Sequence, residues 1–544
     1  MSPGQMTRTY FTLCTRILTT VAALTLPLTG TLPAANAEPL PRNTAHQVEH
    51  PLHATMGQHA RIADDTGNTV LLRGVNVNGL GQYYREWPDL PATTTLTEDD
   101  FERIAALGSN VVRLIISWSA LEPVRGVVDH GYLDRIAQAV EWARANDIYV
   151  QLDMHQDAWG TAVNTRDGVY CPPLTEPDVG WDGAPAWATA LVGTPATCRI
   201  SKRELSVAVQ SSFQNFYLDV NGVQSELVNT WAAVAARFAH DPVVVGYDLL
   251  NEPNPGLLVG VDDYVLLGNY YRRAMAAIRA AEQAAGGFRH IMFFEPSVIT
   301  GGLAFPGPLP LFTSASGSAS GSGTGSGLGS ATGSAAGSAS GSAGDENLVY
   351  APHQYNESIS PLPGSLASGF ADTATAAAGY GTTFFNGEWG FWDSDPAVIA
   401  DKTRRYAALE DKYLIGGTYW QWRQACGDPH NIQTRGTRPT CTAPDTGLDH
   451  DPATASVIAR PYPRSAPGLP TGLTSDIGSG AMTLTGTAET GGGRADLWVP
   501  QRCANPALSG SNITQTGRAQ VPGGWRITAA TNTSGDYRAV ITCG

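Results

Sequence analysis

Two glutamates stand at the ends of apolar segments and have the side chains of an acid and a nucleophile. Glu252 lies in the segment 243–253, VVVGYDLLNEP, and Glu388 lies in the segment 381–389, GTTFFNGEW. The first segment is a continuous apolar run stopped by Pro253, as expected for a strand buried on both faces of a parallel sheet. Enzymes with such strands place their chemistry at the carboxyl ends. Glycoside hydrolysis requires a pair of carboxylates there, one to protonate the leaving oxygen and one to act as nucleophile or base.

Taken alone, the sequence NEP is also compatible with a strand that exits into a capped turn. The other expected strands weaken this alternative, because almost every one ends in a group with chemistry. These residues are Asn76, Asn78, Arg113, His155, Asp157, Asn251, Glu252, Glu295, His353, Tyr355, Glu388 and Trp420. A purely structural origin would leave some strands ending in ordinary turn residues. We therefore expect these side chains to meet at one site.

Eight expected strands would position these residues. They cover 71–77, 110–117, 148–154, 243–250, 290–295, 348–353, 382–388 and 416–422, with helical periodicity in the segments between them. Strands that alternate with helices indicate parallel crossover units. The pattern predicts an α/β fold of the (β/α)8 TIM-barrel type, with a packed interior and its site at the carboxyl-end face.

The motifs LLNEP and FNGEW, with NVVRL, DMHQD, APHQY and YWQW around them, resemble family five of the glycoside hydrolases over residues 71–423. The resemblance implies a retaining β-glycosidase in which Glu252 is the general acid/base and Glu388 the nucleophile. It also implies that Asn251 bonds the sugar 2-hydroxyl and that Arg113 keeps the nucleophile ionised. Further substrate contacts are implied for His155, His353, Tyr355 and Trp420, with a core position as the alternative for the tryptophan.

Within that family, DMHQDAW and the RPYPR stretch followed by a β-domain are more similar to the endoglycoceramidase and endogalactosylceramidase subgroup. Those enzymes cut between the glycan and the ceramide of glycosphingolipids. The similarity implies that Asp157 contacts the sugar. It also implies an apolar wall from the long loop 160–203, with Trp181 and Trp187 as candidates for lipid contact or for plain loop packing.

Two other functions stay open as alternatives. One is a glucanase or mannanase that acts on polysaccharide, and the other is a carbohydrate-binding protein without activity.

The expected partners are a glycosphingolipid or β-glycan substrate and the membrane surface around it. No cofactor is expected, and no CxxC or paired histidine spacing suggests a metal site. The formal net charge of −15 argues against a nucleic-acid partner, and we expect a monomer.

The two ends of the chain differ in character from the barrel. Residues 1–37 carry basic residues, an apolar run and the sequence ANA, as is typical of a signal peptide cleaved near Ala37. We expect the protein to be secreted. Residues 38–463 would form the catalytic domain, with a flexible Ser/Gly-rich insertion at 313–344. Short alternating segments predict a small β-sandwich at 464–544.

Six cysteines follow the predicted signal peptide. An even number in an exported chain indicates disulfides, although the sequence permits about fifteen pairings. Pairing between neighbours along the chain would join Cys171 with Cys198, Cys426 with Cys441, and Cys503 with Cys543.

Overall fold

The computed structural model of the protein describes residues 47–81, 93, 95–189, 198–200, 202–300, 309–312, 345–358, 364–391, 395–423 and 452–544. The predicted signal peptide, the Ser/Gly-rich insertion 313–344 and the predicted pair Cys426 and Cys441 lie outside these ranges. Residues 46–544 form one compact unit. Within the described ranges, no helix has both the length and the apolar character that crossing a bilayer requires.

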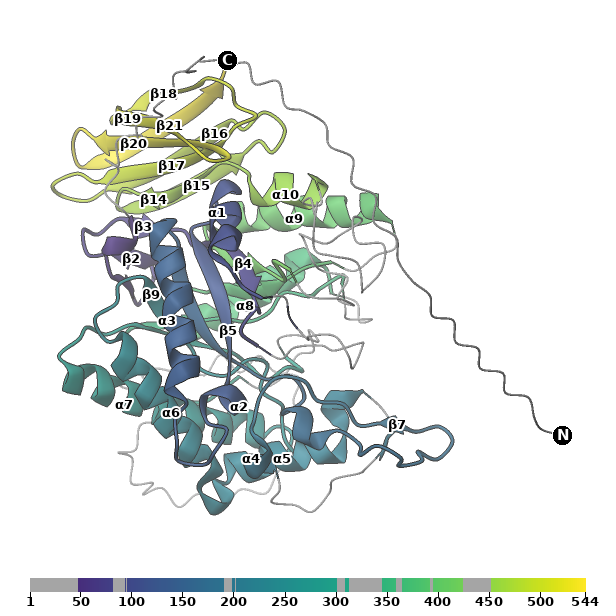
Figure 1. Cartoon of the computed structure of the whole chain (residues 1–544). Helices are drawn as coiled ribbons and strands as arrows, with labels where there is room; N and C mark the ends of the chain where they lie inside the picture. The colour runs from purple at the N-terminus through teal and green to yellow at the C-terminus, as the bar shows by residue number, and fades with distance from the viewer. Residues whose placement is uncertain are drawn as a thin grey trace, which may run out of the picture. The chain divides into compact units, whose positions relative to one another are not determined.

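Eight parallel strands form a curled, TIM-barrel-like sheet (Figure 1). They are β4 (Arg73–Val77), β5 (Val111–Ser117), β6 (Tyr149–His155), β9 (Val244–Asp248), β10 (Ile291–Phe294), β11 (Leu348–Tyr350), β12 (Asn386–Trp389) and β13 (Gly417–Tyr419). Except for β11 and β12, each strand pairs with the next one along the chain, and β13 pairs with β4. Parallel bridges from Tyr350 to Phe384 and from Gln354 to Trp389 connect β11 with the β12 segment. The predicted fold class is confirmed.

Helices connect the strands and cover the outside of the sheet (Figure 1). The α-helices are α1 (Glu98–Ala106), α2 (Trp118–Leu121), α3 (His130–Ala145), α4 (Ala186–Thr189), α5 (Val207–Tyr217), α6 (Val223–Phe238), α7 (Leu267–Ala285), α8 (Leu366–Tyr380), α9 (Pro396–Tyr413) and α10 (Pro452–Ile458). Shorter turns of helix are η1 (Gln47–Glu49), η2 (Thr161–Val163), η4 (Arg203–Leu205), η5 (Val220–Gly222) and η6 (Asp262–Leu266). Side chains cap the amino ends of several helices. At α3, for example, the Asp129 carboxylate accepts the Tyr132 N–H at 2.9 Å.

Two antiparallel sheets are built mainly from strands that follow the barrel in the chain (Figure 1, yellow). One has the order β1-β2-β3-β14-β17-β20-β19 and the other β15-β16-β21-β18. The late strands are β14 (Tyr462–Ala466), β15 (Leu469–Ser475), β16 (Met482–Ala488), β17 (Arg494–Pro500), β18 (Pro506–Ser511), β19 (Ile513–Val521), β20 (Gly524–Thr531) and β21 (Gly535–Cys543). Their inward side chains form a separate apolar cluster that includes Leu484, Leu497 and Ile527.

Three early strands extend the larger of these sheets. They are β1 (Leu52–Ala54), β2 (Ile62–Asp64) and β3 (Thr69–Val70), and β3 pairs antiparallel with β14. Strand β14 itself crosses the position between residues 463 and 464 where the sequence predicts a domain boundary. That boundary stays a prediction.

The sheets contact the barrel at the amino ends of β5 and β6. The Asp147 carboxylate, two residues before β6, lies 3.0 Å from Arg464 Nη2 and 2.8 Å from Arg526 Nη1. Gly108, in the turn before β5, has φ of 82°, and an added Cβ would meet the Trp498 ring at 2.2 Å. The contact therefore lies at the opposite end of the barrel from the carboxyl ends of the strands.

Two disulfides are present among the described cysteines. Cys171 is bonded to Cys198, and Cys503 is bonded to Cys543, as the sequence predicts. The first disulfide stands beside the short hairpin of β7 (Glu176–Pro177) and β8 (Cys198–Arg199), in the long loop that follows β6.

Candidate active site

Arg113, on β5, is the central residue of the site. Its fully buried guanidinium lies 2.8 Å from Glu388 Oε1, 2.9 Å from Asp248 Oδ2 and 2.9 Å from Asn251 Oδ1. Nη1 is 3.1 Å from Asn76, and Nη2 is 3.0 Å from both Asp153 and Glu295. Burial lowers the pKa of Arg113, but the carboxylates around it raise that pKa well above its ordinary value. Residues from five strands are thus tied to one permanent cation.

Glu388 is fixed through both of its carboxylate oxygens. Oε1 accepts from Arg113, and Oε2 accepts the Tyr355 O–H at 2.9 Å. Burial raises the pKa of Glu388, and the neighbouring Glu252 raises it further, while His353 and Arg113 oppose the rise. These two cations favour the ionised form, which is the form a nucleophile needs.

Glu252 lies just beyond β9, beside Glu388. Its Oε1 is 2.8 Å from His353 Nδ1, and the same nitrogen is 3.4 Å from Glu388 Oε2. One oxygen of each glutamate and a nitrogen of His353 all lie within 4.8 Å of one another. Carboxyl groups about 5–5.5 Å apart are typical of retaining glycosidases, and inverting enzymes use about 6.5–9.5 Å. The observed proximity favours the retaining geometry.

The three donors Glu252, His353 and Glu388 also have the composition of a small cation site. Their atoms already satisfy one another and their neighbours, since the His353 nitrogen bridges the two carboxylates. The contacts among these three side chains are therefore enough to explain why they lie close together.

His155 occupies the adjoining part of the site, at the end of β6. Its Nδ1 is 2.7 Å from Asp153 Oδ2, and its Nε2 is 3.3 Å from Asp157 Oδ2. Burial lowers its pKa, but Asp153 and Asp157 raise that pKa well above the usual value. The ring stacks on Trp420 at 5.5 Å and 11°. Trp420 is only 3% exposed and packs with Ile115 and Tyr355, so it lies at the site and is also part of a small apolar cluster.

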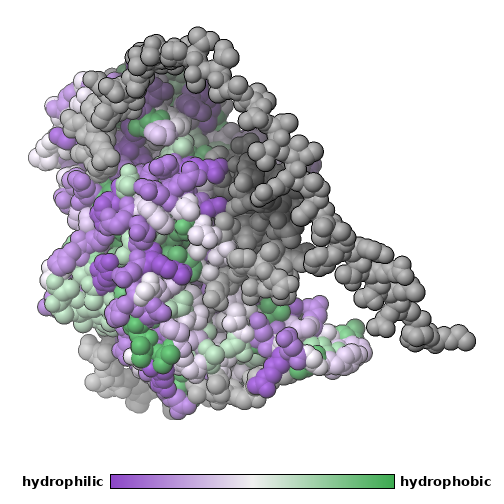
Figure 2. Space-filling model, in the orientation of Figure 1, coloured by the Kyte–Doolittle hydropathy of each residue, from purple (hydrophilic) through white to green (hydrophobic). Residues whose placement is uncertain are grey.

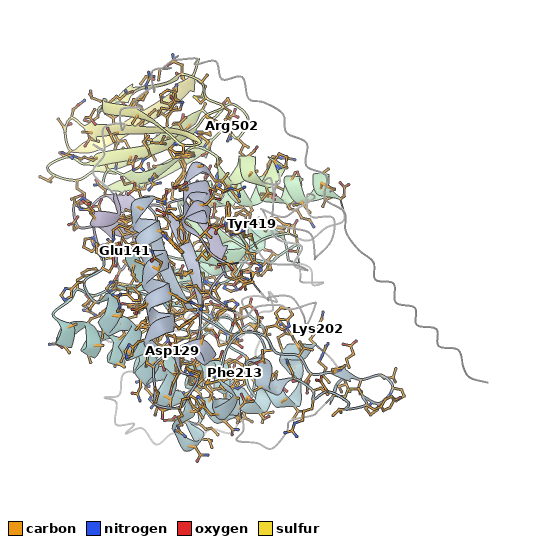
Figure 3. All side chains as sticks on the ribbon, viewed as in Figure 1. Asp129, Glu141, Lys202, Phe213, Tyr419 and Arg502 are labelled. Carbon is orange, nitrogen blue, oxygen red and sulfur yellow. A yellow bond between two sulfur atoms is a disulfide. The ribbon has the colours of Figure 1, made fainter. Side chains whose placement is uncertain are left out.

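The loop after β6 is anchored to the site through Asp157. Asp157 Oδ1 lies 2.5 Å from Arg203 Nη2, and the Arg203 guanidinium lies 3.6 Å above the Trp181 ring. Lys202, labelled in Figure 3, marks this part of the chain. Both carboxylate oxygens of Asp157 therefore have protein partners. Contact between Asp157 and the sugar stays a prediction.

The two loop tryptophans both make packing contacts. The Trp181 ring packs against the Arg203 guanidinium, while the Trp187 indole N–H donates to the Glu122 carbonyl at 3.0 Å. The Trp187 ring also meets Trp118 edge-on at 5.3 Å. These contacts correspond to the packing alternative, and lipid contact by either ring stays a prediction.

The structure thus brings the nine residues with an implied catalytic or substrate-binding role into one connected network, and Asn76 and Glu295 join it through Arg113. It also adds residues that the sequence analysis did not assign to the site. Gln156 Nε2 donates to the carbonyls of Asn251 and Glu252, each at 2.8 Å. Asp153 and Asp248 pair with Arg113 inside apolar strands. An acid within a buried apolar strand is a usable signal, because a buried charge needs a counterion.

Comparisons with known proteins agree with this geometry. The cellulase model of glycosyl hydrolase family 5 matches residues 63–425. A solved endogalactoceramidase structure is 40% identical, with a TM-score of 0.76, over 90% of this chain and 100% of that chain. The lactosyl-enzyme intermediate of endo-glycoceramidase II from Rhodococcus sp. is 25% identical, with a TM-score of 0.67, over 89% of this chain and 99% of that chain.

A curated relative is similar over a shorter segment. Endoglycoceramidase I of Rhodococcus hoagii strain 103S is 31% identical over 219 residues, which are 38% of this chain and 38% of that protein. The chain therefore spans less than half the length of this curated relative.

Proposed function

The chain belongs to family 5 of the glycosyl hydrolases, and on this premise we propose that it is a retaining endo-β-glycosidase that separates the glycan of glycosphingolipids from the ceramide. The observation that carries the proposal is the pair Glu252 and Glu388, which lie close together. Their carboxylates are hydrogen-bonded by Arg113, Tyr355 and His353. The relatives named as endogalactoceramidase and endoglycoceramidase support the choice of substrate.

In the first step, a Glu388 oxygen attacks the anomeric carbon while the bond from that carbon to the ceramide oxygen breaks. Glu252 gives its proton to the departing ceramide oxygen. In the second step, Glu252 takes a proton from water, the water oxygen bonds the anomeric carbon, and Glu388 leaves as a carboxylate. The solved relative in a lactosyl-enzyme state supports a covalent route of this kind.

Arg113 and Tyr355 serve both steps in this proposal, because each donates to one oxygen of Glu388. They stabilise the carboxylate before it attacks and after it leaves. Asn251 is held by Arg113 at Oδ1 and donates to the Gln156 carbonyl at 3.0 Å from Nδ2. The same Nδ2 also lies 3.4 Å from His155 Nε2, and the proposal assigns the amide hydrogen on that side to the sugar 2-hydroxyl.

We also propose that loops at the same end of the barrel touch the lipid surface that carries the substrate. The loop after β6 exposes Tyr170 at 81%, Leu174 at 97% and Ile200 at 85% of their surface. Figure 2 shows hydrophobic residues among hydrophilic ones at the lower right, where Figure 1 places the β7 hairpin. The loop after β9 exposes Leu257, Leu258 and Val259 by half or more.

The position of these side chains follows from topology. Strands β6 and β9 are parallel neighbours, so their following loops leave the sheet at the same end as Glu252. Exposed large apolar side chains on adjoining loops are typical of lipid or protein contact. A Leu174→Asp variant should cosediment less with vesicles of a neutral phospholipid, while its turnover of a water-soluble aryl glycoside should not change.

Secretion is proposed on the leader-like pattern of residues 1–37 and on the two disulfides, which form in oxidising compartments. Amino-terminal sequencing of protein from the culture medium of an expressing host tests it. A mature chain that begins near residue 38 would support cleavage near Ala37.

The substrate proposal is tested with a glycolipid that carries a fluorescent ceramide and with cello-oligosaccharides. Release of fluorescent ceramide, with an intact glycan whose anomeric configuration is retained in the first NMR spectra, is the expected result. Cleavage of the oligosaccharides alone would favour the glucanase alternative and overturn the ceramide assignment. Glu388→Gln is the matched control, because it removes the nucleophile at nearly constant size.

A further inference from the structure

Glu295, directly after β10, is a third glutamate of the site, and the mechanism above leaves it unused. It is buried, and its two carboxylate oxygens have different partners. Oε2 accepts the backbone N–H of Glu252 at 3.0 Å. Oε1 lies 3.2 Å from His353 Nε2 and 3.0 Å from Arg113 Nη2. We propose that Glu295 is a positioning residue for the general acid/base Glu252, acting through the Glu252 backbone and through His353.

The backbone of Glu252 requires such support. Its φ is 38°, in the left-handed region that a residue with a Cβ adopts at a cost of about 1–2 kcal/mol. Glu295 holds the N–H of this residue, and Gln156 Nε2 holds its carbonyl at 2.8 Å. The two side chains therefore fix both peptide groups that set the direction of the Glu252 side chain.

The side chain of Glu252 is fixed through the imidazole. His353 has Glu295 Oε1 at one nitrogen and Glu252 Oε1 at the other, at 3.2 and 2.8 Å. Burial raises the pKa of Glu295 to about 8. Burial lowers the pKa of His353, but Glu295 and the other carboxylates raise it well above its usual value. Both shifts favour an extra proton shared between Glu295 and His353.

That extra proton fixes the direction of the His353 hydrogen bond. If it sits on Glu295, the carboxyl donates to Nε2, and Nδ1 carries the ring hydrogen. If it sits on the imidazole, both nitrogens carry hydrogens. In both cases Nδ1–H points at Glu252 Oε1, so the proton for the leaving group belongs on Glu252 Oε2. The same hydrogen bond stabilises the charge that Glu252 gains as it gives up this proton.

Glutamine at position 295 would break this arrangement without a large change in volume. An amide has one acceptor oxygen, whereas Glu295 accepts through Oε2 from Glu252 and faces His353 and Arg113 with Oε1. If the amide oxygen faces His353 and Arg113, the amide NH2 opposes the Glu252 N–H. If the amide is turned round, its NH2 opposes Arg113. The first orientation loses the contact with the Glu252 backbone, and the second places an NH2 group against the Arg113 guanidinium on the His353 side.

The inference rests on the proposed glycosidase function but not on the ceramide assignment, so its test uses two soluble β-glycosides. One has a dinitrophenol leaving group, which departs without a proton, and the other has an alkyl alcohol, which needs one. For Glu295→Gln we expect kcat/KM on the alkyl glycoside to fall about 10- to 100-fold, since general acids contribute about 10²–10⁴-fold. On the dinitrophenyl glycoside the change should be less than about threefold.

Glu282→Gln is the matched control. Glu282, on α7 and outside the site, is also buried against an imidazole, with Oε1 2.8 Å from His290 Nδ1 and 3.0 Å from its backbone N–H. This variant should lower thermal stability but keep the wild-type ratio between the two substrates. If Glu295→Gln does not fold, the same two substrates are compared with Glu295→Asp. This variant withdraws the carboxylate by one methylene group and keeps its charge.

Equal losses on both substrates, or no loss on either, would overturn the positioning role. Selective loss on the alkyl glycoside supports it. Failure of the wild-type protein to cut a glycolipid, with a normal response to the aryl series, would instead refute only the ceramide assignment. Failure of the wild-type protein to hydrolyse either soluble glycoside would refute the glycosidase function, and this inference with it.

Discussion

Replacing Arg113 with lysine keeps one positive charge in the barrel but removes the planar fork that holds Glu388. Nη1 lies 2.8 Å from Glu388 Oε1, with both side chains almost fully buried. A hydrogen bond to a charged group contributes about 1.5–3 kcal/mol, which corresponds to about 10- to 100-fold in the ionisation equilibrium. Because Arg113 favours the carboxylate, its loss raises the pKa of Glu388. Activity that needs the ionised form is then lost at a higher pH than in the wild type.

The assay is kcat/KM for the dinitrophenyl glycoside as a function of pH, because that substrate does not need the general acid. We expect the ratio of wild type to Arg113→Lys to rise by about 10- to 100-fold toward acidic pH and to shrink as pH increases. Arg279→Lys is the control, since Arg279 is paired with Asp345 at 2.5 Å and Glu282 at 2.7 Å outside the site. A ratio that stays constant with pH would refute the idea that Arg113 controls the ionisation of Glu388.

Three further outcomes follow from contacts in the structure. Glu388→Gln should abolish release of the aglycone from both soluble glycosides, and turnover comparable to wild type would contradict its role as nucleophile. Burial raises the pKa of Asp147, but Arg464 and Arg526 hold it below the usual value, so its stabilising effect is complete above the unfolded pKa and is lost as pH falls through the folded one. Asp147→Asn should therefore cost about 3–5 kcal/mol of unfolding free energy near neutral pH and progressively less in acid, as urea unfolding would measure; an equal cost at every pH would contradict this. Serine at both Cys503 and Cys543 opens a bridge with a sequence separation of 40 residues and should cost about 4 kcal/mol in denaturant unfolding; unchanged unfolding would show that the bridge contributes no stability.

The barrel was predictable because each of its strands is a short apolar run that ends in a polar residue. The run VVVGYDLL became β9, shortened to Val244–Asp248, and NVVRLIIS became β5. The strand ends also predicted which side chains meet, since parallel strands share a carboxyl end. Glu252 and Glu388 therefore lie within reach of the same His353 nitrogen, although 136 residues separate them in sequence.

The contacts between these residues could not be predicted in the same way. That Asp248 faces Arg113 depends on the register of β5, β6 and β9, which the sequence does not state. The bond from Arg203 to Asp157 depends on the path of a long irregular loop. Strands β2 and β3 have only 3 and 2 residues. Nothing in such short segments indicates that β3 would pair with β14.

The joining of β3 to β14 has a consequence for anyone who wishes to shorten or recombine this protein. The sheet that contains β14, β17, β20 and β19 takes its other edge from residues 52–70, so the carboxyl-terminal strands do not form a complete unit by themselves. A chain that begins at β4 would leave the β14 edge unpaired, and exposed strand edges recruit other chains and promote aggregation. Removal of the last strands would in turn leave β1 to β3 without the sheet they extend. Fusions and domain exchanges should carry both ends of the chain together.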